Sequence, residues 1–203
     1  MGRVANPLAL RELHEQRVPF LVQGANFHFA LGLAERLPMD QSFAALTQSL
    51  ASYALNSRDF VEASRLFAVL AKHCAARGNA RGEAIAYHQL GRIAEEQREF
   101  ATAREWYLKS LDIEEKQGNL HGAAGTYHQL GILAGLQGSF EDCCRWLARS
   151  IASFRGALDP RLADQGIGDF LLFYRRASPA VRQKLEAIWS EANLGLFPTE
   201  PKP

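Results

Sequence analysis

The sequence repeats itself at an interval of forty residues, and this period limits the folds that the chain can adopt. GNARGEAIAYHQLG begins at Gly78 and GNLHGAAGTYHQLG begins at Gly118, and about 14 of 40 aligned positions are identical between the two copies. Weaker copies lie upstream in the same register, which is shown by the recurring positions Leu10, Leu50, Leu90 and Leu130, and Phe20, Phe60, Phe100 and Phe140. The sequence therefore predicts an array of repeated structural units.

Each repeat has the pattern of a helical hairpin. Apolar residues recur at helical spacing in two successive segments, which in one repeat contain Tyr87, Leu90, Ile93 and Ala94, then Ala103, Trp106, Tyr107 and Leu111. Gly78 and Gly118 supply the left-handed conformation that commonly ends a helix, and the asparagine after each glycine can cap the next helix. Gly131 falls inside a helix, where glycine costs about 1 kcal/mol relative to alanine. We therefore expect its backbone to lie close to the crossing helix at Cys143.

The repeats resemble the tetratricopeptide repeat (TPR). The family pattern is a large aromatic residue, then Leu-Gly, and later an alanine followed four residues on by another aromatic. The matching residues are Tyr87, Leu90-Gly91, Ala94, Ala103 and Tyr107, and Tyr127, Leu130-Gly131, Ala134, Cys143 and Leu147. The longer period is similar to the subgroup found in kinesin light chains, LGN-like scaffolds and bacterial regulatory arrays. The resemblance implies an all-α fold, a right-handed superhelical α-solenoid of antiparallel helix pairs.

The register divides the chain into about four repeats and a degenerate C-terminal helical pair. We expect one TPR-like solenoid over residues 1–193, with repeats at 6–38, 40–77, 79–117 and 119–156 and capping helices in 159–193. Asp159-Pro160 and Ser178-Pro179 each have the pattern of a helix cap followed by the first helical residue. Residues 194–203 contain three prolines and are predicted to form a flexible tail.

The charge balance and the cysteine content limit the classes of partner and compartment. Lys and Arg number 23 and Asp and Glu number 22, so no long-range positive field attracts nucleic acid or anionic membranes. The three cysteines form no CxxC pair, which favours free thiols and a reducing compartment. No long apolar run predicts a membrane span. We expect a cytoplasmic protein that binds neither nucleic acid nor membrane.

The resemblance implies which residues face a concave groove, because the first helices of stacked hairpins line it in the family. These positions are Ala45, Gln48, Ser49, Ser52, Leu55 and Asn56; Ile85, His88, Gln89, Arg92, Glu95 and Glu96; Gly125, His128, Gln129, Ile132, Gly135 and Leu136; and Arg175 and Arg176. The expected peptide-binding side chains are Gln48, Ser52, Asn56, Ile85, His88, Gln89, Arg92, Glu95, His128, Gln129, Ile132 and Leu136. The two histidines either contact a ligand or form hydrogen bonds between repeats.

The N-terminal helical region carries a second apolar stripe that contains Val22, Phe29 and Leu33. In one interpretation this stripe packs on the next repeat, as the second helices of such stacks do. In the other, it is an interface with a missing upstream domain or with a second copy of the chain, which would make a homo-oligomer.

No pattern for catalysis is visible in the sequence. The histidines at matching positions have no recurring cysteine or carboxylate beside them, so we expect no metal site, and no paired carboxylates or nucleophile constellation point to an enzyme. We expect no cofactor. The leading hypothesis is a protein-protein interaction module that binds a peptide or a partner helix in the groove. The alternative is a structural, sensor or oligomerisation segment of a larger bacterial-type signalling protein with an idle groove.

Overall fold

The computed structural model of the chain describes residues 25–26, 29–33 and 40–198. The regular secondary structure of these residues is entirely α-helical, which confirms the predicted all-α fold. Most of the predicted first repeat, 6–38, lies outside the described residues, as does Val22.

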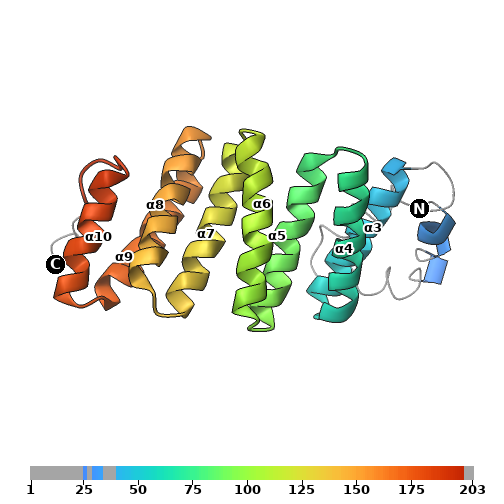
Figure 1. Ribbon diagram of the computed structural model, residues 1–203, viewed down its shortest axis with the longest axis horizontal. Helices are drawn as coiled ribbons and strands as arrows, with labels where there is room; N and C mark the ends of the chain where they lie inside the picture. The colour runs from blue at the N-terminus through green and yellow to red at the C-terminus, as the bar shows by residue number, and fades with distance from the viewer. Residues whose placement is uncertain (1–24, 27–28, 34–39, 199–203) are drawn as a thin grey trace. The chain divides into compact units, whose positions relative to one another are not determined.

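The helices follow the forty-residue register. They are α3 (Asp40–Asn56), α4 (Phe60–Ala76), α5 (Ala80–Glu96), α6 (Phe100–Lys116), α7 (Leu120–Leu136), α8 (Phe140–Gly156), α9 (Pro160–Arg176) and α10 (Pro179–Glu191). The helices from α3 to α9 have 17 residues each, and their first residues are spaced by half the sequence period. Two helices therefore fall in each of the predicted repeat ranges 40–77, 79–117 and 119–156, joined by short turns (Figure 1).

The turns between helices have the predicted chemistry. Gly78 and Gly118 have φ values of 65° and 63°, in the left-handed region that glycine adopts without a steric penalty. The side chain of Asn119 accepts a hydrogen bond from the backbone N–H of Gly122 at 3.1 Å, and Asn79 caps α5 in the same way. In the next turn of this register, Leu158 has a φ of 58° and is 87% exposed.

The described residues belong to two compact units, Met1–Trp106 and Tyr107–Pro203. In the first unit α4 contacts both α3 and α5. Its core is built from one apolar stripe of each helix, with Leu46, Leu50, Leu66, Phe67, Leu70, Leu90 and Ile93 among the buried side chains. The rings of Tyr87 and Trp106 stack at 5.5 Å beside this core. The buried side chains that hold the first unit together therefore fall at the helical spacing that the sequence shows.

In the second unit α8 contacts α7, α9 and α10. The core includes Cys143, Leu147, Ile151, Phe170, Leu185 and Trp189, all nearly inaccessible to solvent. A side chain at Gly131 would place its Cβ 2.9 Å from Leu147 Cγ and 3.2 Å from the carbonyl oxygen of Cys143. This close approach is the one predicted for Gly131. It explains why glycine is kept inside α7 despite its low helix propensity.

The segment after α10 differs from the prediction of a flexible tail that begins at residue 194. Leu194 is only 4% exposed, and the indole N–H of Trp189 donates a hydrogen bond to the Gly195 carbonyl at 3.1 Å. The ring of Phe197 lies 4.9 Å from that of Tyr174 and 5.6 Å from that of Trp189. The prediction relied on the prolines and was wrong at this point. The apolar residues before the prolines pack on α9 and α10. Residues 199–203 of this segment lie outside the described part of the chain.

Candidate functional site

The predicted groove residues are accessible to solvent, with one exception. On α3, Gln48 and Asn56 are exposed and Ser52 is half-buried, whereas Ser49 is fully buried and its hydroxyl donates a hydrogen bond to the Ala45 carbonyl. Ser49 is therefore not a ligand-contact residue. The sequence pattern missed this because a small polar residue can satisfy its hydroxyl on its own helix and fit into the core.

On α5, the predicted groove residues are exposed or half-buried, and one of them is a histidine. Ile85 and Arg92 are exposed, and His88, Gln89 and Glu95 are half-buried. Arg92 donates a hydrogen bond to the side-chain oxygen of Gln89 at 3.1 Å. Burial, together with the positive charge of Arg92, lowers the pKa of His88 to about 4. His88 is therefore neutral at physiological pH and presents a polar but uncharged ring.

On α7 and α9 the structure pairs a predicted residue with one that the sequence reasoning missed. His128 Nε2 lies 2.8 Å from Asp169 Oδ2, and their side chains are 16% and 29% exposed. A carboxylate only accepts, so the imidazole N–H is the donor in this hydrogen bond. The register could have indicated Asp169, because it occupies on α9 the position that Gln129 occupies on α7. Of the two roles left open for His128, the structure shows the hydrogen bond between repeats.

The same two helices also carry apolar side chains that are accessible to solvent. Leu136 on α7 is 59% exposed and Leu172 on α9 is 43% exposed, with Ile132 half-buried. Together with His128 and Asp169, these residues are called the α7/α9 face below. Helix α7 contains no lysine, arginine, aspartate or glutamate, so this helix brings no formal charge to the surface apart from any on its histidines. The face therefore combines apolar side chains with one hydrogen-bonded polar pair.

Two glycines leave the helix backbone uncovered near the polar pair. A Cβ at Gly125 on α7 or at Gly168 on α9 would meet no atom within 4 Å, so no packing contact requires glycine at either position. Gly135 differs from both, because a Cβ there would collide with the ring of Phe173.

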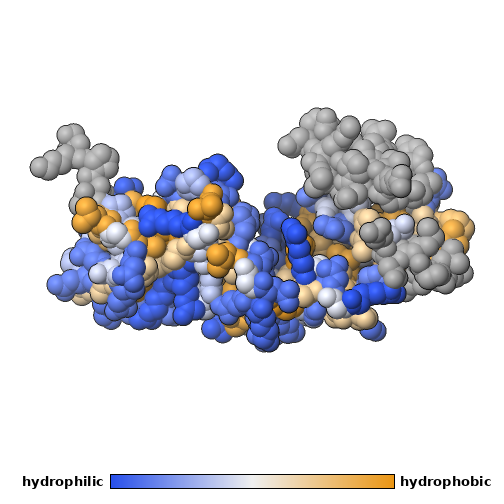
Figure 2. All heavy atoms as spheres, turned by 90° about the horizontal axis from the view of Figure 1, so that it is seen from above, coloured by the Kyte–Doolittle hydropathy of each residue, from blue (hydrophilic) through white to orange (hydrophobic). Residues whose placement is uncertain are grey.

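On the surface that Figure 2 shows, hydrophobic side chains form separate patches among hydrophilic ones.

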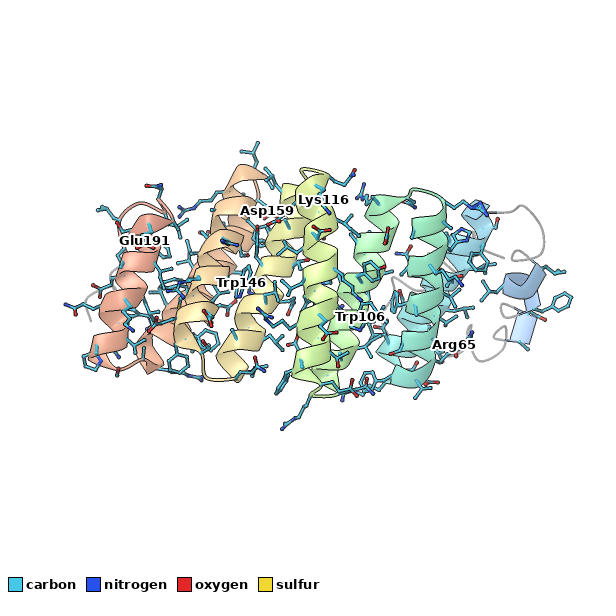
Figure 3. All side chains as sticks on the ribbon, viewed as in Figure 1. Arg65, Trp106, Lys116, Trp146, Asp159 and Glu191 are labelled. Carbon is cyan, nitrogen blue, oxygen red and sulfur yellow. The ribbon has the colours of Figure 1, made fainter. Side chains whose placement is uncertain are left out.

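Aromatic rings recur between the two helices of a repeat. The rings of Tyr127 and Trp146 stack at 5.8 Å, and the Arg149 guanidinium lies 5.2 Å from the Trp146 ring. Trp146 and its counterpart Trp106 are labelled in Figure 3. The Tyr127 hydroxyl also donates a hydrogen bond to Glu115. Burial and this carboxylate raise the pKa of Tyr127 to about 12. These contacts are internal to the repeat stack, as the sequence pattern indicates for its tryptophans.

The buried titratable groups are closed to a ligand. A hydrogen bond with Cys144, together with burial, raises the pKa of Cys143, so its thiol stays protonated and unreactive. Burial also raises the pKa of Glu114, against the hydrogen bonds of Thr126 and Ser110, which favour the ionised form. Within the part of the chain that the structure describes, no group of three or more His, Cys, Asp and Glu side chains could hold a metal ion. No helix there is long and apolar enough to cross a membrane.

Comparisons with known proteins support the fold and go no further. No protein-family model matches the sequence, and no curated protein matches it significantly. The solved structures similar to it include the crystal structure of BtubC (BKLC) from P. vanneervenii, with a TM-score of 0.73 and 19% sequence identity over 100% of this chain and 85% of that one.

At this identity the likeness shows the fold alone, which is an α-solenoid of helical repeats. Folds of this class commonly serve as protein-interaction modules, because stacked helices present an extended surface.

Proposed function

We propose that this chain is a non-catalytic protein-interaction module of the TPR type, which binds an extended peptide or a partner helix on the first helices of its repeats. The observation that carries the proposal is the α7/α9 face, where Leu136 and Leu172 keep 59% and 43% of their surface exposed. Exposed apolar side chains near polar groups are typical of binding surfaces. The buried free thiols fit a reducing cytoplasm, and the balanced charge favours a protein partner over nucleic acid.

The proposal is tested with a displayed library of random short peptides, from which binders are selected and their Kd values are measured by fluorescence anisotropy. The double change Leu136→Ser and Leu172→Ser should weaken binding by about tenfold or more, because it removes about 2 kcal/mol of apolar contact. Leu158→Ser is the matched control, since Leu158 is even more exposed but lies in the turn before α9. Failure to select any peptide, or equal losses in both variants, would reject the proposal.

A second candidate function is oligomerisation through the N-terminal apolar stripe. Phe29 and Leu33 are 70% and 42% exposed and lie four residues apart, so these two apolar side chains are accessible on the same side of the helical region. This observation favours a second copy of the chain, or an upstream domain, as the partner of that stripe. Sedimentation velocity distinguishes the cases: a dimer that dissociates on Phe29→Ser supports self-association, whereas a concentration-independent monomer rejects it.

A further inference from the structure

One carboxyl group is buried in the second unit without full hydrogen bonding. Glu114, on α6, is only 5% exposed, and the hydroxyl groups of Ser110 and Thr126 donate hydrogen bonds to its carboxyl group. Its other oxygen, Oε2, has no hydrogen-bond partner within the part of the chain that the structure describes. Burying an unpaired polar atom is costly, and burying an unpaired charge costs much more. This position is therefore unfavourable for an ionised carboxylate.

Glu114 occupies a register position that holds a less polar side chain in the neighbouring repeats. The residues at this position are Cys74, Glu114 and Phe154, and all three are buried. The backbone carbonyl of each accepts a hydrogen bond at 2.9 Å from the residue five positions later, which is Asn79, Asn119 or Asp159. These three connections, called joints below, thus share one backbone geometry. They differ in the buried side chain, and glutamate alone of the three types is ionised at neutral pH in water.

The Glu114 side chain lies against the first turn of α7. The side-chain oxygen of Asn119 caps this turn by accepting a hydrogen bond from the Gly122 N–H at 3.1 Å. A Cβ at Gly122 would lie 2.7 Å from Glu114 Oε1, so a side chain there would crowd the carboxyl group. A change in the charge of Glu114 therefore acts first on the cap of α7.

No charged side chain compensates for the burial of Glu114 within the described residues. On α6 the next two residues, Glu115 and Lys116, are exposed. Helix α7 has no lysine, arginine, aspartate or glutamate, and its first histidine, His121, pairs with Asp159. Burial is accordingly the main cause that raises the pKa of Glu114, against the hydrogen bonds of the two hydroxyl groups.

We propose that Glu114 is a proton-controlled latch at the joint between α6 and α7. With its proton, the neutral carboxyl group stays buried and the first turn of α7 stays capped. Without the proton, the carboxylate regains its hydration only when that turn opens. The latch acts on the connection between the two helices and does not depend on the proposed peptide binding.

The direction of the pH response follows from proton linkage. Glutamate in the open joint ionises near its ordinary pKa of 4.5, and burial raises the pKa of Glu114 in the closed joint. Above pH 4.5 the closed joint therefore binds more protons than the open one, and it is most stable below this pH. The equilibrium constant for opening should rise by up to about tenfold for each pH unit, until the closed form has also lost its proton.

Hydrogen exchange followed by NMR tests the latch at single amides of the full chain. The reporters are the N–H groups of Asn119 and Gly122. The internal controls are the N–H groups of Asn79 and Gly82, which make the same two hydrogen bonds at the joint that holds Cys74. As the pH rises from 4.5, the protection factors of the reporters should fall and those of the controls should stay constant.

Two variants assign the response to one carboxyl group. Glu114→Gln keeps the shape of the side chain and cannot ionise, so the reporters should lose their pH dependence. Glu105→Gln removes an exposed carboxylate from the same helix, and the pH dependence should remain.

The outcomes that would overturn the latch are distinct. Equal pH responses at both joints of the unaltered chain would show only general unfolding, and this comparison holds even if Glu114→Gln does not fold. A response that survives in Glu114→Gln, or that disappears in Glu105→Gln, would also reject the assignment. So would constant protection of Asn119 and Gly122 over a pH range in which carbon NMR shows the Glu114 carboxyl group losing its proton.

Discussion

The imidazole of His128 and the carboxylate of Asp169 are 2.8 Å apart, and this hydrogen bond joins α7 to α9 across successive repeats. Because both side chains are mostly shielded from solvent, the bond is stronger than an exposed one, and each group would be costly to leave unpaired. The second of the two recurring histidines, His128, therefore has a structural role in the second unit. A ligand that binds beside it meets a polar group already held in place.

This pair predicts a coupling that a double-mutant cycle can measure. His128→Ala and Asp169→Ala should each lower the free energy of unfolding by about 1–2 kcal/mol, and the double variant should lose about 1 kcal/mol less than the sum, because the bond is lost only once. Urea unfolding followed by circular dichroism gives these values. Strict additivity would contradict the hydrogen bond.

His88 predicts a loss of stability in mild acid. Its pKa is about 4 in the folded chain, below the ordinary 6.5, so the unfolded chain binds more protons between these two pH values. The free energy of unfolding should therefore fall as the pH is lowered from 6.5 towards 4, by up to about 3 kcal/mol from this group. In His88→Gln that part of the pH dependence should vanish. An unchanged slope in the variant would show that His88 is not the group responsible.

We expect the substitution of Gly168 by alanine to stabilise the folded chain. A methyl group there meets open space, so Gly168→Ala should raise the free energy of unfolding by about 1 kcal/mol through helix propensity alone. Gly131→Ala is the control and should destabilise the chain, because its Cβ would crowd Leu147 and the Cys143 carbonyl. Thermal unfolding of both variants checks the two signs. A loss of stability in Gly168→Ala would reveal a packing contact at this position.

Leu158 predicts a second gain of stability. Its φ of 58° is sterically unfavourable for any residue that has a Cβ. Gly78 and Gly118 occupy the matching positions of the earlier repeats and have no Cβ, so they do not have this steric penalty. Leu158→Gly should therefore raise the free energy of unfolding by roughly 0.5–1 kcal/mol. Leu158→Ala removes the same exposed side chain but keeps the backbone strain, and it should give no such gain. Equal stability of the two variants in urea unfolding would argue against strain.

Phe197 tests the role of the segment after α10. Its ring contacts those of Phe170, Tyr174 and Trp189, so Phe197→Ala should lower the free energy of unfolding by about 1–2 kcal/mol. The neighbouring Leu196 is 97% exposed, and Leu196→Ala should change nothing. Differential scanning calorimetry of the two variants makes the comparison. Equal melting temperatures would mean that the segment does not stabilise the cap.

Local sequence signals were enough for the helices and the turns. Gly118 and Asn119 indicated the end of one helix and the start of the next because both signals act within a few residues. Gly131 indicated a close helix crossing for a different reason, because glycine is unfavourable inside a helix unless a neighbouring helix leaves no room for a side chain. The packing of Leu194 and Phe197 was missed, because it depends on which surface the end of α10 leaves uncovered and not on local propensity.

The candidate site divides in the same way. The family resemblance implied that His128, Ile132 and Leu136 face one groove, and their spacing agrees, since residues three and four apart share a side of a helix. Only the tertiary structure brought Asp169 of α9 to His128 of α7. The sequence by itself determined the period and the helices, which follow from short-range patterns. Packing between repeats decided which side chains meet and which stay exposed, because those contacts join residues about forty positions apart.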